Sequence, residues 1–342
     1  MADPQRIVVR APNWLGDAVM ALPALAAVRR HAAGTLIVAA REGLSALFQE
    51  DTEAAPDEIV TIDPSREAAQ LRAIGADAIL LLPNSFRSAW LASRSGIPQR
   101  WGYRTAGRRW LLTQAVRRPR GHLHQVRYYL DLVRALGIDA ADDVPRIRAR
   151  PATLERADTL LRESGIPAGA QIAGLAPGAA YGYAKRWPPT RVAQLVTQLS
   201  ARGITAVLVG AASDRETARA IESSLPQGVR AVDLTGRTTL RGLVGVLARC
   251  AAFVSNDSGA MHVAAALGVP LTAIFGPTDE RETAPMGPGP RDVILRDVFC
   301  RPCMLRECPI DHRCMKRITV DAVLDSVEKN LALGATGSLP RS

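Results

Sequence analysis

Short apolar strands alternate with amphipathic helices along nearly the whole chain, and the alternation runs in two blocks. The first block predicts strands at residues 7–10, 35–39, 58–62 and 78–82. The second block predicts strands at residues 172–176, 205–209, 229–233, 252–255 and 271–275. Strands that alternate with helices at this spacing pair in parallel, because each helix returns the chain to the start of the next strand. We therefore predict an α/β protein with two doubly wound domains that face each other across a cleft.

The boundary between the two blocks lies where the strand pattern stops near residues 149–152. A helix is predicted at residues 153–164, and a Gly- and Ala-rich stretch follows it. The length of 342 residues fits two domains at the usual size of about 150 residues each. We predict an N-terminal domain at residues 1–165, a C-terminal domain at residues 166–330 and a flexible tail at residues 331–342.

Targeting signals are missing from the sequence pattern. No apolar run reaches the roughly 18–20 residues that a membrane-spanning helix needs. The first six residues pass directly into a strand, without the apolar core of a signal peptide. We therefore expect a cytoplasmic protein.

Positive charge is concentrated in one segment. Between Arg87 and Arg134 the chain has eleven arginines, no lysine and a single acid, Asp131, so this segment carries +10, as much as the whole protein. Arginine suits phosphate because its planar guanidinium donates two parallel hydrogen bonds. One interpretation is a surface for a polyanion such as a phosphorylated lipid headgroup, a nucleic acid or an anionic glycan, and the other is an ordinary solvated surface.

The stretch at residues 252–270 carries the clearest candidate site. An apolar strand runs into Asn-Asp-Ser-Gly and then into a helix of small residues. Asp257 and Ser258 suit a helix N-cap, and Gly259 begins the helix. The free first-turn amides and the helix dipole favour an anion there. His262 lies one turn after Ser258 and on the same face, so a phosphate would meet amides, a hydroxyl and an imidazole together. The alternative is a well-capped turn without a ligand.

Two further strand ends place a charged residue before a helix. Asp17 follows Gly16 at the expected start of a helix over residues 17–30, where it can act either as N-cap or as a general base. Burial would have to raise its pKa, since a helix N-terminus lowers the pKa of a carboxyl. Lys185 ends a glycine-containing loop and can neutralise a diphosphate, or it can be an ordinary surface cation.

A third strand end carries Asp214, which can cap the following helix or accept hydrogen bonds from a ribose. Neither the G-x-G-x-x-G fingerprint nor a P-loop occurs in the chain, so the standard dinucleotide and NTPase motifs are excluded.

Four of the five cysteines lie within 15 residues, at Cys300, Cys303, Cys308 and Cys314. Such clusters in cytoplasmic proteins bind metal more often than they form disulfides. The spacing is not that of two paired C-x-x-C motifs, so a structural zinc site and free thiols both remain open.

Taken together, these motifs resemble those of the ADP-heptose:lipopolysaccharide heptosyltransferases, and most closely those of members that add the second heptose of the core. The resemblance spans roughly residues 6–330. It rests on Arg-x-Pro-Asn-Trp-Leu-Gly-Asp at residues 10–17, Pro-Gly-Ala at 177–179, Ala-Lys-Arg-Trp-Pro at 184–188, and Asn-Asp-Ser-Gly-x-Met-His-Val-Ala-Ala-Ala at 256–266. The cysteine-rich stretch is similar to that of the same subgroup.

The resemblance implies a GT-B fold, with two Rossmann-like domains, and an inverting sugar transfer that needs no metal or other cofactor. Asp17 would be the base, Lys185 the diphosphate contact and Asp214 a ribose contact. The cradle for the nucleotide diphosphate would consist of Asp257, Ser258, Gly259 and His262. The implied donor is ADP-heptose, held by the C-terminal domain, and the implied acceptor is heptosyl-Kdo2-lipid A, held by the N-terminal domain.

On this interpretation the arginine-rich segment would hold the enzyme at the anionic inner-membrane surface, on its cytoplasmic face. The motifs do not separate the first, second and later heptose additions. A nucleic-acid-binding protein and a non-catalytic sugar-nucleotide-binding protein are the rival classes. We expect no nucleic acid partner, because the basic segment contains no known binding motif.

Overall fold

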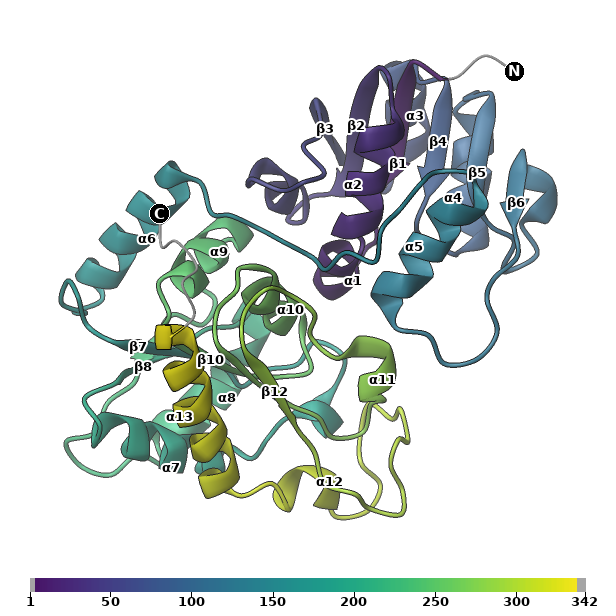
Figure 1. Cartoon of the computed structure of the whole chain (residues 1–342). Coiled ribbons are helices and arrows are strands. Elements are labelled where there is room, and N and C mark those ends of the chain that lie inside the picture. Colours follow the sequence, from purple (N-terminus) through teal and green to yellow (C-terminus); the bar gives the residue numbers. More distant parts are fainter. Residues whose placement is uncertain (1–3, 337–342) are drawn as a thin grey trace. The chain divides into compact units, whose positions relative to one another are not determined.

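The computed structural model describes residues 4–336. The chain divides into two compact units, Met1–Arg148 and Ala149–Ser342, and each is a parallel sheet covered by helices (Figure 1). The predicted α/β class with two doubly wound domains is thus confirmed.

The sheet of the first unit has six parallel strands in the order β3-β2-β1-β4-β5-β6. The strands are β1 (Arg6–Arg10), β2 (Thr35–Arg41), β3 (Glu58–Ile62), β4 (Ala78–Leu81), β5 (Gln99–Tyr103) and β6 (Gln114–Val116). The central strand β1 pairs on both sides, with Val8 opposite Ile37 and Ile79. All three side chains are fully buried, as the continuous apolar pattern of a parallel sheet requires.

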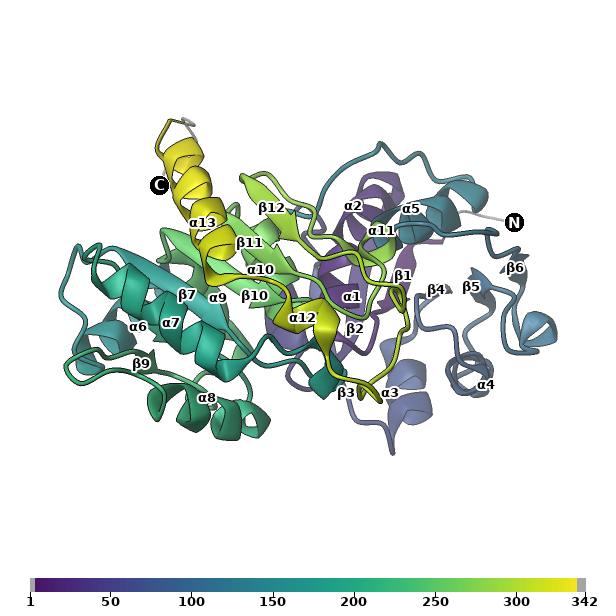
Figure 2. The same ribbon diagram turned by 90° about the horizontal axis from the view of Figure 1, so that it is seen from below.

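Helices cover both faces of this sheet. They are α1 (Leu15–Met20), α2 (Leu22–His31), α3 (Glu67–Ile74), α4 (Phe86–Arg94) and α5 (Gln125–Ala135), with 3-10 turns η1 (Ser45–Gln49) and η2 (Arg109–Leu111). Helices α1 and α2 pack with α5, and α3 packs with α4. Figure 2 shows α2 and α5 on one side of the sheet and α3 and α4 on the other.

The second unit has six parallel strands in the order β12-β11-β10-β7-β8-β9. Its strands are β7 (Ile172–Ala176), β8 (Thr205–Leu208), β9 (Val232–Asp233), β10 (Ala252–Asn256), β11 (Leu271–Ile274) and β12 (Arg291–Ile294). Its helices are α6 (Pro151–Glu163), α7 (Pro189–Ser200), α8 (Arg215–Glu222), α9 (Leu240–Ala248), α10 (Gly259–Ala266), α11 (Glu280–Thr283), α12 (Arg313–Lys316) and α13 (Val320–Thr336), with 3-10 turns η3 (Tyr183–Lys185) and η4 (Ala212–Asp214).

Strand order reverses once in each sheet, between β1 and β4 in the first unit and between β7 and β10 in the second. Ligands of doubly wound sheets bind beyond the carboxyl ends of the strands at such a reversal, because the loops diverge there and leave a crevice. The segments that follow β1, β7 and β10 carry Asp17, Lys185 and Asp257.

The structure divides the chain 17 residues before the predicted boundary, after Arg148 rather than after residue 165. Helix α6, expected in the first domain, packs against α9 of the second unit. A Cβ atom at Gly245 would lie 2.7 Å from the carbonyl oxygen of Thr153. The two helices therefore approach more closely than any larger residue would allow.

Two other expectations differ from the structure. Residues 331–336 of the predicted flexible tail belong to α13, which lies beside α7 (Figures 1 and 2), and the rest of the tail lies outside the described residues. The single helix expected at residues 17–30 is two helices joined at Ala21, and it begins earlier, at Leu15. Pro23 lies in the first turn of α2, where its missing N–H costs nothing, whereas within one continuous helix it would remove a hydrogen bond.

Candidate active site

Asp17 lies in the first turn of α1, directly beyond the carboxyl end of β1. Trp14, and not Asp17, is the N-cap residue. The Asp17 side chain accepts a hydrogen bond from the hydroxyl of Tyr129 on α5. Asp17 therefore does not act as the N-cap residue, which was one of its two predicted roles.

Burial raises the pKa of Asp17 from 3.8 to about 6, and the Tyr129 hydrogen bond opposes part of that rise. Tyr129 is itself buried, which raises its own pKa, so its hydroxyl stays protonated and serves as a donor. A carboxyl with a pKa near 6 is ionised at neutral pH and still basic enough to take a proton. Burial therefore gives Asp17 the raised pKa that a general base at the start of a helix needs.

The loop between β1 and α1, directly before the helix that carries Asp17, is held by a buried ion pair. Arg10, the last residue of β1, donates from Nε to Glu67 Oε1 at 2.7 Å and from Nη2 to Asn13 Oδ1 at 2.8 Å. Its remaining terminal nitrogen donates to the carbonyl of Ala11. Both side chains of the Arg10–Glu67 pair are nearly inaccessible. One guanidinium thus ties the β1–α1 loop to the start of α3.

In the second unit, Lys185 and Asp257 form an ion pair. Lys185 Nζ lies 2.5 Å from Asp257 Oδ2, and the Thr278 hydroxyl donates to the same oxygen at 2.7 Å. Lys185 comes from the loop at residues 177–188, which we call the lysine loop, and Asp257 follows β10. The structure brings together two residues 72 positions apart that the sequence placed separately at strand ends.

Asn256 ties these two loops to each other. Its side-chain amide donates to the carbonyl of Pro177 at 2.7 Å and accepts from the backbone N–H of Trp187 at 3.2 Å. Helix α10 then begins at Gly259, with Ser258 as N-cap residue in an extended conformation. Because the Ser258 side chain makes no cap hydrogen bond, the first-turn amides of α10 keep their capacity to bind an anion.

The other predicted cradle residues lie in the same region. Ser258 Oγ is 3.0 Å from Ser255 Oγ. His262 is buried in α10, one turn beyond Ser258. The structure thus places Lys185 against Asp257, which directly precedes Ser258 and Gly259, and His262 lies in the helix that these residues begin.

Asp214 is buried at the end of the η4 turn. Its carboxylate accepts from the backbone N–H of Ala211 at 3.0 Å and lies 3.4 Å from Arg186 Nη2. A Cβ atom at Gly178 would lie 2.3 Å from Asp214 Oδ1, so this glycine lets the lysine loop pass directly over the Asp214 carboxylate. The ribose contact implied for Asp214 stays a prediction, since its carboxylate is engaged within the protein here.

The five cysteines are free thiols, and no three of their sulfur atoms, all in the described part of the chain, lie within 4.8 Å of one another. Cys250 is buried, which raises its pKa to about 12, as expected of a core thiol. Cys308 Sγ accepts the backbone N–H of His312 at 3.2 Å. A structural zinc at the other four cysteines stays a prediction.

The arginine-rich segment divides into structural and exposed side chains. Arg108 is completely buried and donates to the carbonyls of Tyr103, Pro83 and Ser85, and its burial lowers its pKa to about 10. Arg100 donates to backbone carbonyls near it. Seven of the eleven are exposed, namely Arg87, Arg94, Arg104, Arg109, Arg117, Arg118 and Arg120.

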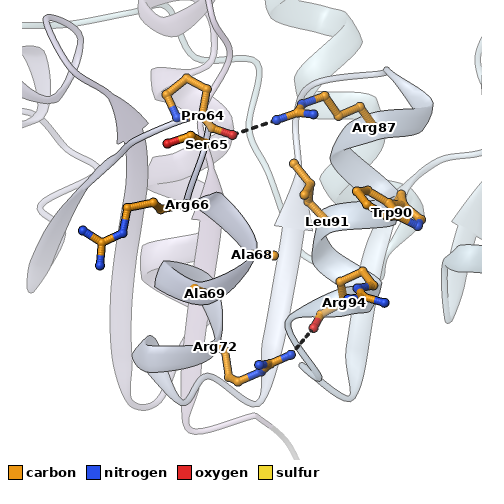
Figure 3. A pocket seen from close by; sticks show the side chains of 10 residues that line it. All are labelled: Pro64, Ser65, Arg66, Ala68, Ala69, Arg72, Arg87, Trp90, Leu91 and Arg94. Carbon is orange, nitrogen blue, oxygen red and sulfur yellow. Dashed lines mark hydrogen bonds between the residues drawn. The ribbon is translucent and has the colours of Figure 1, made fainter.

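A groove of about 400 Å³ lies between α3 and α4, and its lining includes Arg66, Arg72, Arg87 and Arg94 (Figure 3). Arg87 reaches across from α4 to donate to the Pro64 carbonyl at 2.7 Å. At the other end, Arg72 reaches from α3 to the Arg94 carbonyl at 2.6 Å. Each guanidinium has further N–H groups beyond this bond, so both ends of the groove can bind anions.

Exposed aromatic side chains lie near this groove. Phe86 and Trp90 of α4 are 42% and 43% exposed, and Trp110 is 73% exposed. The rings of Phe86 and Trp110 lie 6.1 Å apart, and Arg94 lies over the ring of Trp90. Within residues 4–336, no helix is both long enough and apolar enough to cross a membrane.

No role was predicted from the sequence for Tyr129, Thr278 or Arg10. Thr278 follows the strand predicted at residues 271–275, and Arg10 ends the strand predicted at residues 7–10, so the strand-end signal used elsewhere was present for both. Tyr129 had no such signal, because its role comes from a contact between distant segments.

Comparison with known proteins finds similar sequences and structures over most of the chain. The model of glycosyltransferase family 9 (heptosyltransferase) matches residues 66–313. Lipopolysaccharide heptosyltransferase 2 of Escherichia coli (strain K12) is 34% identical over 298 residues, which cover 82% of this chain and 85% of that protein. Lipooligosaccharide heptosyltransferase 2 of Campylobacter jejuni is 28% identical over 334 residues, which cover 95% of this chain and 98% of that protein. The solved structure of E. coli ADP-heptose LPS heptosyltransferase II superposes with a TM-score of 0.82 at 28% identity, covering 96% of this chain and 98% of that one.

Proposed function

Because the chain belongs to glycosyltransferase family 9, the heptosyltransferases, we propose that it transfers heptose from ADP-heptose to heptosyl-Kdo2-lipid A in the synthesis of the lipopolysaccharide inner core. Two relatives named heptosyltransferase 2 and a solved heptosyltransferase II align with most of the chain, which supports the second heptose addition over the first.

The donor would bind to the second unit, beyond the carboxyl ends of β7 and β10. There Lys185 and the first-turn amides of α10 offer positive charge to a diphosphate, and Asp257 holds the lysine side chain in place. Asp214 would receive the ribose, and His262 would line the floor of the cradle.

Asp17 would act as the base in a single inverting displacement. Its carboxylate takes the proton of an acceptor hydroxyl as that oxygen forms a bond to the anomeric carbon of the donor. The bond between the anomeric carbon and the phosphate oxygen breaks, and its electron pair leaves with ADP. Lys185 and the α10 amides stabilise the charge that develops on the leaving group. The proposal requires no metal in this step.

The observation that carries this proposal is the environment of Asp17. A carboxyl at the switch point of the first sheet has a pKa of about 6 and a buried tyrosine donor. A residue that only capped a helix would have its pKa lowered, whereas a base needs it raised.

We further propose that the first unit binds the acceptor at the anionic cytoplasmic face of the inner membrane. The groove between α3 and α4 places Arg72 and Arg87 at its two ends, and Trp110 and Phe86 are exposed nearby. Arginine binds phosphates and carboxylates, and exposed tryptophan favours the membrane interface. Each arginine near an anionic surface contributes about 1 kcal/mol to binding.

The function is tested by heptose transfer from ADP-heptose, with Kdo2-lipid A and heptosyl-Kdo2-lipid A as separate acceptors. Wild type should use the acceptor that already carries a heptose, and Asp17→Asn should lower kcat by a factor on the order of 10² to 10⁴. Asp139→Asn removes an exposed carboxylate from the same unit and is the matched control. Transfer only to Kdo2-lipid A would reassign the chain to the first addition, and no transfer to either would refute the proposal.

Membrane contact is tested by co-sedimentation with phosphatidylglycerol vesicles at two salt concentrations. Binding should weaken with salt, and Arg87→Ala should weaken it by about fivefold. Arg156, a residue of α6 in the other unit, provides the control variant Arg156→Ala. Equal binding to neutral phosphatidylcholine vesicles would refute the electrostatic part of the proposal.

A further inference from the structure

The segment at residues 300–314, which we call the cysteine segment, has no role in the function proposed above. It follows β12 and leads into α12. Its backbone and side chains contact two loops of the second unit, the lysine loop and the loop that follows β11. These two loops supply the two partners of Asp257, namely Lys185 and Thr278.

The cysteine segment makes three hydrogen bonds to the lysine loop. The Tyr181 hydroxyl donates to the Met304 carbonyl at 2.7 Å. The backbone N–H of Ala184 donates to the Arg306 carbonyl at 2.9 Å. His312 Nε2 lies 2.6 Å from the Ala184 carbonyl, so the ring carries its proton on Nε2 and donates it there. Ala184, directly before Lys185, is therefore held from both sides.

The contact is too close for any side chain at Gly182. A Cβ atom there would lie 2.4 Å from the Arg306 carbonyl oxygen. The lysine loop and the cysteine segment thus touch through their backbones, so a movement of either must move the other.

Arg301 makes the contact to the second loop. Its Nε donates to the Gly276 carbonyl at 2.8 Å, and its Nη2 donates to the Thr278 carbonyl at 3.1 Å. The Arg301 side chain is only 8% exposed. The backbone N–H of Met304 adds a bond to the Pro277 carbonyl at 2.9 Å. Met304 therefore contacts both loops, accepting from one and donating to the other.

These contacts hold the ammonium group of Lys185 in one position. Lys185 Nζ is 4.7 Å from the centre of the Tyr181 ring as well as 2.5 Å from Asp257 Oδ2. A lysine side chain has many rotamers, so holding it in one position before a ligand arrives lowers the entropy cost of binding. The Arg306 guanidinium lies 5.3 Å from the same ring, on the cysteine segment.

We propose that the cysteine segment is a brace that positions Lys185 and Thr278 around Asp257 for diphosphate binding. Tyr181, His312 and Arg301 are its positioning residues. The inference rests on the proposed function, since it takes Lys185 as the diphosphate contact.

The test compares the affinities for ADP and AMP by isothermal titration calorimetry. AMP lacks the β-phosphate, to which we assign the Lys185 contact within the diphosphate, so a residue acting through Lys185 should change only the ADP affinity. His312→Ala and Tyr181→Leu should each weaken ADP binding by about fivefold, the effect of one net hydrogen bond, and leave AMP binding unchanged. His312→Gln keeps a side-chain donor and should recover part of the loss. Ile310→Ala, an exposed position in the same segment, is the control.

A double-mutant cycle separates positioning from general loss of structure. In the Lys185→Ala background, His312→Ala should have no further effect on ADP binding, because the group that it positions is gone. A further fivefold loss there, or an equal loss for AMP, would overturn the brace.

Lys185→Ala by itself tests the function on which the brace depends. It should weaken ADP binding by roughly tenfold or more, as expected for a hydrogen bond to a charged group. If it does and the His312 and Tyr181 variants do not, the brace alone is wrong. If Lys185→Ala leaves the ratio of ADP to AMP affinity unchanged, the diphosphate role itself fails.

Discussion

Replacing Asp17 by asparagine should stabilise the first unit while it removes the activity. Burial raises the pKa of this carboxyl from 3.8 to about 6, and one pKa unit corresponds to about 1.4 kcal/mol. The ionised carboxylate therefore lowers the free energy of unfolding by at most about 3 kcal/mol relative to a neutral group. Asp17 is only partly buried, and solvent screening reduces this cost, so we expect a gain of about 1–3 kcal/mol for Asp17→Asn. Asparagine keeps an oxygen that can accept from Tyr129.

The sign of the effect depends on pH. Below pH 3.8 the carboxyl is protonated in the folded and unfolded states, so wild type and variant should be equally stable. As the pH rises from about 4 to 6, the folded state keeps a proton that the unfolded state has released, so the stability of wild type falls. Above pH 6 the full difference should be present. The kcat/KM of wild type should rise over the same range, because the carboxylate is the active form of the base.

Urea unfolding of both proteins from pH 4 to pH 8 measures this difference directly. Asp139→Asn, at an exposed position of the same unit, should show no such gain. A stability difference between wild type and Asp17→Asn that does not change with pH would refute the reasoning. So would a variant less stable than wild type at pH 8, since the cost of burying the charge would then be absent.

Three further substitutions test neighbouring contacts. Tyr129→Phe removes the donor that lowers the pKa of Asp17, so the rise of kcat/KM with pH should move above pH 6, and an unshifted profile would contradict this. Arg10→Met leaves Glu67 as an unpaired buried charge and should lower the free energy of unfolding by about 3–5 kcal/mol in urea, whereas no loss would mean that the pair is dispensable. Gly182→Ala places a Cβ against the Arg306 carbonyl and should lower the stability of the second unit by about 1–3 kcal/mol. Thermal unfolding measures this loss, and an unchanged melting temperature would contradict it.

Local turn chemistry explains why much of the candidate site was predictable. Asp17 and Asp257 each follow an apolar strand, and each lies at the start of a helix or directly before one, so both signals are local in the sequence. Parallel strands place all such turns at one edge of their sheet. The proximity of Lys185 to Asp257 was therefore implied by two strand ends, although neither the ion pair nor the shared contact with Thr278 could be read from them.

The domain boundary was not predictable, because it depends on contacts between distant helices. The helix near residues 151–163 has an ordinary amphipathic pattern that fits either domain. Its place in the second unit follows from Gly245, more than 80 residues later, which lets α9 approach the Thr153 backbone. In the sequence, a glycine within a helical pattern only indicates low helix propensity. The packing role of Gly245 therefore has no local signature.

The arginines show why a charge count cannot by itself define a binding surface. Arg108 is buried and Arg301 is nearly buried, and both donate to backbone carbonyls, so their guanidinium groups hold loops in place. The planar guanidinium that suits phosphate suits backbone carbonyls equally well. Salt dependence should therefore separate the two classes. Neutralising Arg87 at the groove should reduce the effect of salt on vesicle binding, whereas replacing Arg108 should reduce stability and leave that salt dependence unchanged in the fraction that remains folded.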